Sequence, residues 1–153
     1  MVSIVEMQEL PNLPGTELEP TGWLEITQER IDQFADATND HQFIHVDSER
    51  AEKSPFDSTV AHGYLTLSLA TFFGMQSGVQ PEGLTMALNY GSDKVRYLAP
   101  VRVGARIRAL QKIAAVTEKR PGHWLITTAV TIEIEGEETP ALIAEILVLY
   151  IVS

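Results

Sequence analysis

The sequence predicts an α+β domain in which an antiparallel sheet curls around one buried helix. Two observations support this fold class. The stretch "GYLTLSLATFF", within residues 62–76, is apolar or small on nearly all sides, which is typical of a helix covered on most of its surface. Four long strand-like segments follow it, at about residues 84–97, 103–116, 124–134 and 141–152. The strands supply the layer that such a helix needs around it.

The elements before this helix are shorter. Residues up to about Glu19 contain "PNLPG" and are expected to form a loop or arm, and "GWLEIT" to form a short strand. Thr27 can cap a helix that should end near Asn39. One face of that helix would carry the residues at the i, i+3, i+4 and i+7 positions, namely Ile31, Phe34, Ala35 and Thr38. "DSERAEKS" favours a further short helix, which "SPFD" ends.

The four strand-like segments alternate in a way that fits an antiparallel sheet. Apolar residues from Val103 to Ala109 alternate with more polar positions such as Arg106 and Arg108, and Val130 to Ile134 alternate in the same way. "KRPGH" and "EGEET" are turn sequences. The last segment, "ALIAEILVLYIV", is apolar on both faces apart from Glu145, so we expect a central strand or a subunit interface.

Composition excludes several classes of function. The chain has 153 residues, which fits a single domain over 1–153 with its own core. It has no cysteine, which excludes thiolate catalysis, disulfides and cysteine-bound zinc. Its net charge of −10 should repel nucleic acid and anionic membranes. No apolar run reaches the roughly 18 residues that span a bilayer, and the N-terminus does not resemble a secretory signal, so we expect a cytoplasmic protein.

One stretch departs from the acidic balance. Six basic residues and no acidic ones lie between positions 94 and 112: Lys94, Arg96, Arg102, Arg106, Arg108 and Lys112. This basic stripe can attract a small polyanion such as a phosphorylated cofactor. Taken alone, however, the six residues fit better as ordinary solvent-facing positions on strands.

The stretch "NDHQFIH", residues 39–45, is the first candidate site. Asp40 and His45 are five residues apart, a poor spacing on a regular helix, but in a loop their side chains can converge on one water. A carboxylate and a neutral imidazole around a water form a general acid–base pair. The same spacing also fits an Asp that closes a turn and a half-buried histidine with a structural role.

The stretch "VAHGYL", residues 60–65, is the second candidate site. Gly63 lies at the expected start of the apolar helix, where free N–H groups and the positive end of the dipole point outward. A glycine there lets a ligand carbonyl oxygen approach the N–H closely, as in an oxyanion hole. The alternative is a glycine tolerated in the first turn for packing reasons. His62 is expected to be a packing residue of the first turn.

A metal site is the alternative for the histidines. His41 and His45 have a metal-ligand spacing, and Asp47 could add an oxygen. The surroundings supply no further ligand typical of the known zinc motifs, so we expect no metal and expect His41 to be exposed.

The two candidate stretches occur together in a longer pattern. The run "FADATNDHQFIHVDSERAEKSPFDSTVAHGYLTLSL" resembles the signature of the MaoC-like, hydratase-2 family of hot-dog proteins. "LNYGSDKVRYLAPVRVGARIRA" is similar to a later segment of the same family, in particular of its NodN-like single-domain branch. The resemblance covers about residues 20 to 152.

The resemblance implies a hot-dog fold, usually paired into a homodimer, and (R)-specific enoyl-CoA hydratase activity. The catalytic pair would be Asp40 and His45, and the oxyanion donor would be the N–H of Gly63. The coenzyme A thioester would be the substrate carrier, and no separate cofactor or metal would be needed. The chain departs from the family pattern at Gln42-Phe43, where Asn-Pro is common, and at Leu98, where proline is frequent.

Three other functions remain to be distinguished. A hot-dog acyl-CoA thioesterase would release free thiol. A non-catalytic acyl-thioester-binding dimer would not need both Asp40 and His45. A dehydratase acting on carrier-bound substrate would show a basic docking face.

Overall fold

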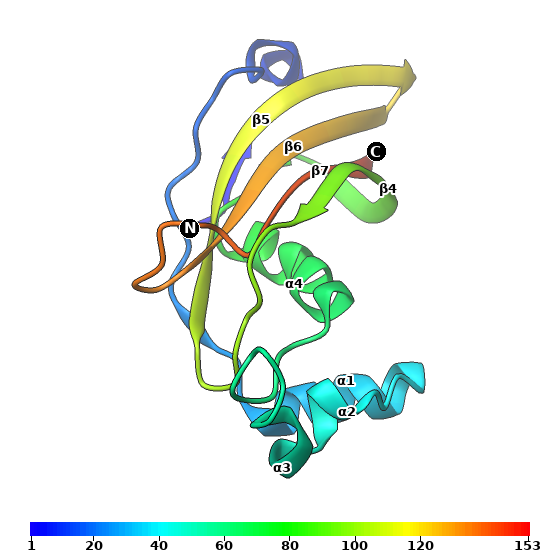
Figure 1. The fold of residues 1–153 in the computed structure, drawn as a ribbon. Helices are drawn as coiled ribbons and strands as arrows, with labels where there is room; N and C mark the ends of the chain where they lie inside the picture. The colour runs from blue at the N-terminus through cyan, green and yellow to red at the C-terminus, as the bar shows by residue number, and fades with distance from the viewer.

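The computed structural model describes residues 1–153, and its central feature is a five-stranded antiparallel sheet curved around helix α4, Gly63–Gln76 (Figure 1). The strand order is β2-β5-β6-β7-β4. The bounds are Leu24–Glu25 for β2, Leu84–Tyr97 for β4, Arg106–Arg120 for β5, His123–Ile134 for β6 and Leu142–Val152 for β7. The predicted α+β class and the curled antiparallel sheet are confirmed.

A second, two-stranded sheet involves the N-terminus. β1, Ser3–Val5, pairs in parallel with β3, Val79–Pro81, and a 3-10 helix η1, Met7–Asn12, follows β1. The expectation of a loop or arm up to Glu19 is therefore wrong for these residues. β1 owes its strand conformation to a partner distant in the sequence, which the local pattern cannot reveal.

The three short helices lie together at one end of the sheet, beyond the start of α4 (Figure 1). They are α1, Gln28–Thr38, α2, Phe43–Val46, and α3, Ser48–Ala51. The predicted cap is confirmed, because the Thr27 side chain accepts a hydrogen bond from the Arg30 N–H at 3.2 Å. The predicted end is confirmed too, since Asn39 closes the helix in the left-handed conformation with φ 58°.

The long strands follow the predicted alternation. Ile107 and Ala109 of β5 are buried while Arg106 is exposed, and β7 lies centrally between β6 and β4 as expected. The start of β5 was predicted three residues too early. Gly104 has a φ of 83°, and the Ala105 N–H donates to the Arg102 carbonyl at 3.0 Å, so a turn precedes the strand.

Helix α4 packs on the concave face of the sheet through only one of its sides. Leu65, Leu69 and Phe73 join the main hydrophobic core, whose sheet side includes Ile107, Val130 and Ile132. The opposite side of α4 exposes Tyr64, Phe72 and Met75. The expectation that this helix is buried on most sides is therefore wrong for the single chain, because the sheet curves over one side alone. None of the helices has the length and apolarity needed to cross a bilayer.

Candidate active site

The segment after α1 positions the Asp40 carboxylate. Asn39 reverses the chain in the left-handed conformation, which asparagine tolerates better than most residues. The Asp40 carboxylate then accepts a hydrogen bond from the Gln42 N–H at 3.3 Å, and α2 begins at Phe43. This turn brings Asp40 and His45 together in spite of their unfavourable helical spacing. The carboxylate group remains exposed to solvent.

His45 is buried and held from two sides. Its Nδ1 lies 2.6 Å from the carbonyl oxygen of Val60, which can only accept, so Nδ1 carries the proton. The Gln28 side chain donates to the His45 carbonyl at 2.7 Å and accepts from the Thr59 hydroxyl at 2.5 Å. Nε2 of His45 is thereby left unprotonated, with its lone pair free to accept a proton.

The electrostatics of His45 favour the neutral ring. Burial lowers the pKa of His45 below its ordinary value of 6.5, and the neighbouring His62 adds to this effect. The hydrogen bond to Val60 and the charge of Asp40 oppose the shift without cancelling it. At neutral pH the ring is therefore a neutral base.

Gly63 supplies a backbone donor beside this base. It is the first residue of α4, so its N–H has no partner within the helix. The ring of Tyr97 lies so close that a Cβ on Gly63 would be 2.9 Å from Tyr97 Cε1. Gly63 and His45 both line one cavity, so the donor and the base face the same space.

This cavity has a volume of about 470 Å³. Most of its wall is apolar, which suits an acyl chain or the pantetheine part of a thioester. Asp40 is not part of the wall. The lining residues come from α2, the start of α4, the end of β4 and the segments that connect these elements and precede β7, and are Ile44, His45, Phe56, Val60, Ala61, Gly63, Tyr64, Thr66, Tyr97, Leu98, Ala99, Pro100, Val101 and Ala141.

His41 and Asp47 do not join this site. The Nε2 of exposed His41 pairs with Asp36 at 2.7 Å, and Asp47 caps α3 by accepting from the Arg50 N–H at 3.1 Å. Two residues at which the chain departs from the family pattern, Phe43 and Leu98, make contacts of their own in this region. Phe43 packs under the Arg50 guanidinium at 4.3 Å, and Leu98 lines the cavity.

His62 is the member of the site that sequence reasoning missed. One nitrogen of His62, one nitrogen of His45 and a carboxylate oxygen of Asp40 lie within 4.8 Å of one another. The two imidazoles stack at 3.8 Å with 22° between their planes. Because ring lone pairs lie in the ring planes, those of two stacked rings run almost parallel and do not converge on one ion. The only sequence signal for His62 was its place next to Gly63.

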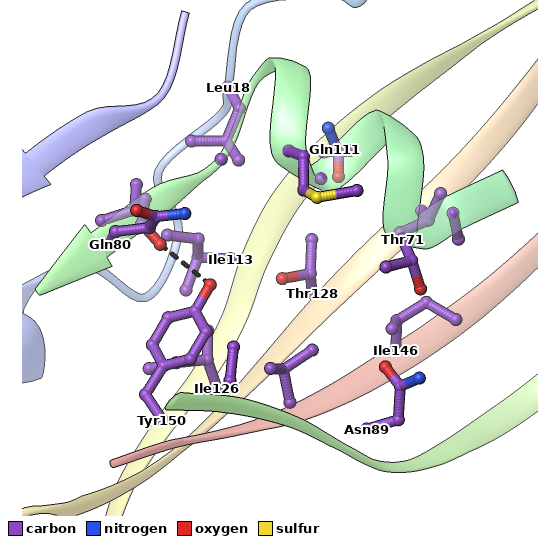
Figure 2. A pocket seen from close by; sticks show the side chains of 18 residues that line it. Leu18, Thr71, Gln80, Asn89, Gln111, Ile113, Ile126, Thr128, Ile146 and Tyr150 are labelled. Atoms are coloured by element: carbon purple, nitrogen blue, oxygen red, sulfur yellow. Dashed lines mark hydrogen bonds between the residues drawn. The ribbon is translucent and has the colours of Figure 1, made fainter. Parts of the chain in front are cut away.

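A second cavity, of about 260 Å³, lies between the C-terminal half of α4 and the sheet (Figure 2). Thr71, Ile146 and Asn89 point toward it from α4, β7 and β4. The only ionisable group in its wall is Tyr150, whose hydroxyl donates to the Val79 carbonyl at 3.0 Å and whose pKa is raised by burial. Because its wall contains no acid–base pair, this cavity is suited to binding an apolar group and not to proton transfer.

The basic stripe is mostly neutralised by acidic partners. Four of its members pair with carboxylates: Lys94 with Glu145 at 2.9 Å, Arg106 with Glu135 at 3.1 Å, Arg108 with Glu133 at 2.8 Å and Lys112 with Glu17 at 3.8 Å. Arg96 and Arg102 have no carboxylate partner. These two flank the segment 97–101 that lines the larger cavity, and Arg102 donates to the carbonyl of Phe56 in the same wall.

Comparison with known proteins shows which proteins this chain resembles over its length. Over 151 residues the chain is 41% identical to the 3-hydroxyacyl-thioester dehydratase Z of Mycobacterium tuberculosis, covering 99% of both chains. Over 142 residues it is 44% identical to Nodulation protein N of Rhizobium leguminosarum bv. viciae, covering 92% of this chain and 88% of that one.

Among solved structures, an (R)-hydratase of A. caviae superposes with a TM-score of 0.71 at 23% identity, covering 88% of this chain and 94% of the other, which supports the hot-dog fold. The family described as "MaoC like domain" matches residues 9–137. The predicted resemblance is thus confirmed, and the chain belongs to the MaoC-like domain family.

Proposed function

We propose that the protein is an (R)-specific enoyl-CoA hydratase, which in reverse is a 3-hydroxyacyl-thioester dehydratase and is therefore a hydro-lyase. The observation that carries this proposal is that the Asp40 carboxylate lies within 4.8 Å of a nitrogen of His45, and that His45 and Gly63 line one apolar cavity. The full-length likeness to a protein named 3-hydroxyacyl-thioester dehydratase supports the same reaction.

In the proposed mechanism, the thioester carbonyl accepts a hydrogen bond from the Gly63 N–H, which draws electron density away from the conjugated double bond. A water held between Asp40 and His45 adds its oxygen to C3, and His45 Nε2 takes the proton that the water loses. The imidazolium passes this proton to the Asp40 carboxylate, which delivers it to C2, so both groups end in the protonation states in which they began. In the dehydration direction the two roles are exchanged.

The proposed mechanism requires no cofactor. Addition of water changes no net oxidation state, so no redox group takes part. The negative charge that develops on the carbonyl oxygen is stabilised by the first N–H of α4 and by the helix dipole. A preorganised donor of this kind contributes about 10²- to 10³-fold to the turnover rate.

We propose that the substrate is carried by coenzyme A, with Arg96 and Arg102 binding its phosphates. These are the members of the basic stripe without a carboxylate partner, and both adjoin the cavity wall at residues 97–101. A carrier-protein substrate would call for a broader basic docking face than two arginines on a chain of net charge −10. Because the substrate is a coenzyme A thioester, we also propose a cytoplasmic location.

We further propose that the protein acts as a homodimer. β4 is an edge strand of the sheet and exposes Met86, Leu88 and Tyr90, while the uncovered side of α4 exposes Phe72 and Met75. Pairing of two β4 strands would satisfy their free backbone groups and cover both sets of side chains.

The proposed activity is tested with crotonyl-CoA. Purified protein should remove the absorbance of the conjugated enoyl thioester and yield the (R)-3-hydroxy product by chiral analysis, with no release of free thiol. Thiol release would instead identify a thioesterase, and binding without turnover would identify an acyl-thioester-binding protein. Turnover of carrier-bound crotonyl groups only would contradict the proposed role of coenzyme A.

A further inference from the structure

His62 is buried at the centre of the site. Its side chain is 3% exposed and lies between the ring of Phe34, at 4.9 Å, and the ring of His45, at 3.8 Å. His62 occupies the N-cap position of α4 but makes no capping hydrogen bond to that helix. Its polar atoms are therefore used elsewhere.

The Nε2 of His62 lies 3.0 Å from the backbone carbonyl oxygen of Asp40. A carbonyl only accepts, so Nε2 carries the proton and donates it. This hydrogen bond joins the end of α1 to the start of α4. Because His62 directly precedes Gly63 in the chain, this bond also fixes the backbone of Asp40 relative to the proposed oxyanion donor.

The other nitrogen of His62 is buried without a hydrogen-bond partner. An unpaired buried acceptor is unfavourable. A phenylalanine would fill the same space between the rings of Phe34 and His45 and would bury no unpaired nitrogen there. A residue present only for packing would not need an imidazole here. The histidine is explained if both of its properties are used, the flat ring against His45 and the N–H toward Asp40.

We infer that His62 is a positioning residue for the proposed hydratase reaction, which aligns His45 by stacking and Asp40 by a hydrogen bond relative to the N–H of Gly63. One side chain thereby fixes the distances among all three groups. The inference rests on the proposed function for its kinetic readout. It assigns His62 no direct contact with the substrate.

Two substitutions separate the two contributions. His62→Phe keeps a flat ring against His45 but loses the N–H donor, whereas His62→Gln keeps a donor that can reach Asp40 but loses the ring. Small displacements of reacting groups cost up to about 100-fold in rate. We expect each variant to lower kcat for crotonyl-CoA about 10- to 100-fold and to change KM less than about threefold, and His62→Ala to lower kcat further.

His41→Gln is the matched control. It also removes a histidine close to Asp40 in the sequence, but His41 is exposed and pairs with Asp36 outside the site. It should retain the kcat of the unmodified protein. Thermal unfolding of each variant separates loss of activity from loss of fold. Near-normal kcat in both His62→Phe and His62→Gln would overturn the inference, as would losses in kcat that only follow the unfolded fraction.

A readout independent of activity distinguishes this inference from the proposed function. Imidazole ¹⁵N NMR of the unmodified protein should show His62 protonated at Nε2 and unprotonated at Nδ1. The opposite tautomer would overturn the positioning role even in an active enzyme. Failure to hydrate crotonyl-CoA with the expected tautomer present would refute the proposed reaction while leaving the hydrogen bond to Asp40 in place.

Discussion

At the scale of single residues, the proposed chemistry depends on which nitrogen of His45 carries its proton. The Val60 carbonyl holds that proton on Nδ1, so Nε2 is a base before any substrate arrives. Asp40 and His45 differ in their surroundings: the Asp40 carboxylate is exposed to solvent, whereas the His45 imidazole is buried. The two groups are thus suited to different roles.

Removing either member of this pair should abolish most of the activity. Asp40→Asn and His45→Gln each remove a proton-transfer group, and general acid–base catalysis contributes about 10²- to 10⁴-fold. We expect kcat for crotonyl-CoA to fall by this range, with the melting temperature changed far less for exposed Asp40 than for buried His45. A variant with a near-normal rate would show that its residue is not catalytic.

The lowered pKa of His45 predicts the acid side of the pH profile. Since the base must be neutral, kcat/KM should begin to fall only below pH 6.5, the ordinary pKa of histidine. Stability should respond with the same sign. Between the folded pKa and 6.5 the unfolded chain binds a proton that the folded chain does not, so the free energy of unfolding decreases as pH falls through this window.

The comparison protein for the stability effect is His45→Gln. Melting temperatures of both proteins, measured from roughly pH 5 to pH 7.5, should converge as pH falls, because only the unmodified chain loses the contribution of a neutral buried His45. A constant difference across this range would contradict the lowered pKa.

At the scale of elements, the first turn of α4 and the end of β4 depend on each other. Gly63→Ala would place a methyl group 2.9 Å from the Tyr97 ring, so the ring or the helix start must move. The cost of moving an oxyanion donor is about 10²- to 10³-fold in kcat. We expect a loss of this order, with a fall in melting temperature limited to the cost of moving the Tyr97 ring, because Gly63 does not have a positive φ.

A double-mutant cycle tests the cause of that loss. In a Tyr97→Ala background the added methyl group has room, so Gly63→Ala should cost much less there than in the unmodified protein. An equal cost in both backgrounds would mean that the glycine matters for a reason other than contact with Tyr97.

Local sequence signals explain which elements were predictable. The Thr27 cap, the helix end near Asn39 and the alternation from Ile107 to Ala109 each depend on neighbouring residues, and all were predicted. β1 depends on pairing with β3, and the contacts of His62 join α1 to α4. Such contacts between distant segments leave no local pattern in the sequence, so β1 and the role of His62 were missed.

Only part of the candidate site was predicted, because the rest also depends on contacts between distant segments. The resemblance to the MaoC-like family named Asp40, His45 and Gly63, and the structure places Asp40 beside His45, which shares a cavity with Gly63. It could not separate Arg96 and Arg102 from the rest of the basic stripe. That distinction depends on ion pairs between strands, such as that of Lys94 with Glu145.

At the scale of the whole molecule, the unpaired arginines predict how the substrate carrier is held. Arg96→Gln and Arg102→Gln should each raise KM for crotonyl-CoA severalfold while kcat changes little, because phosphate contacts lie away from the reacting carbons. Added salt should raise KM less in the variants than in the unmodified protein. Arg106→Gln is the control, since Arg106 already pairs with Glu135 and should show no such change.

The uncovered apolar side of the molecule predicts a dimer. Replacing Leu88 on β4 or Phe72 on α4 with glutamate should shift the protein toward monomer in sedimentation or light-scattering measurements, because a buried unpaired charge opposes association. Ile4→Glu, at an exposed position on β1, should leave the assembly unchanged. A monomeric unmodified protein would contradict the proposed assembly.

The cavity wall has a further consequence for how such enzymes diversify. The proposed reacting groups and the side chains that hydrogen-bond to these residues lie in one continuous stretch, residues 28–63, whereas the opposite wall comes from residues 97–101 and Ala141. Chemistry and substrate preference therefore occupy separate parts of the gene. Exchanges at residues 98–100 can alter which acyl groups fit while leaving the reacting side chains in place, which makes these three residues the natural target for engineering new substrate ranges.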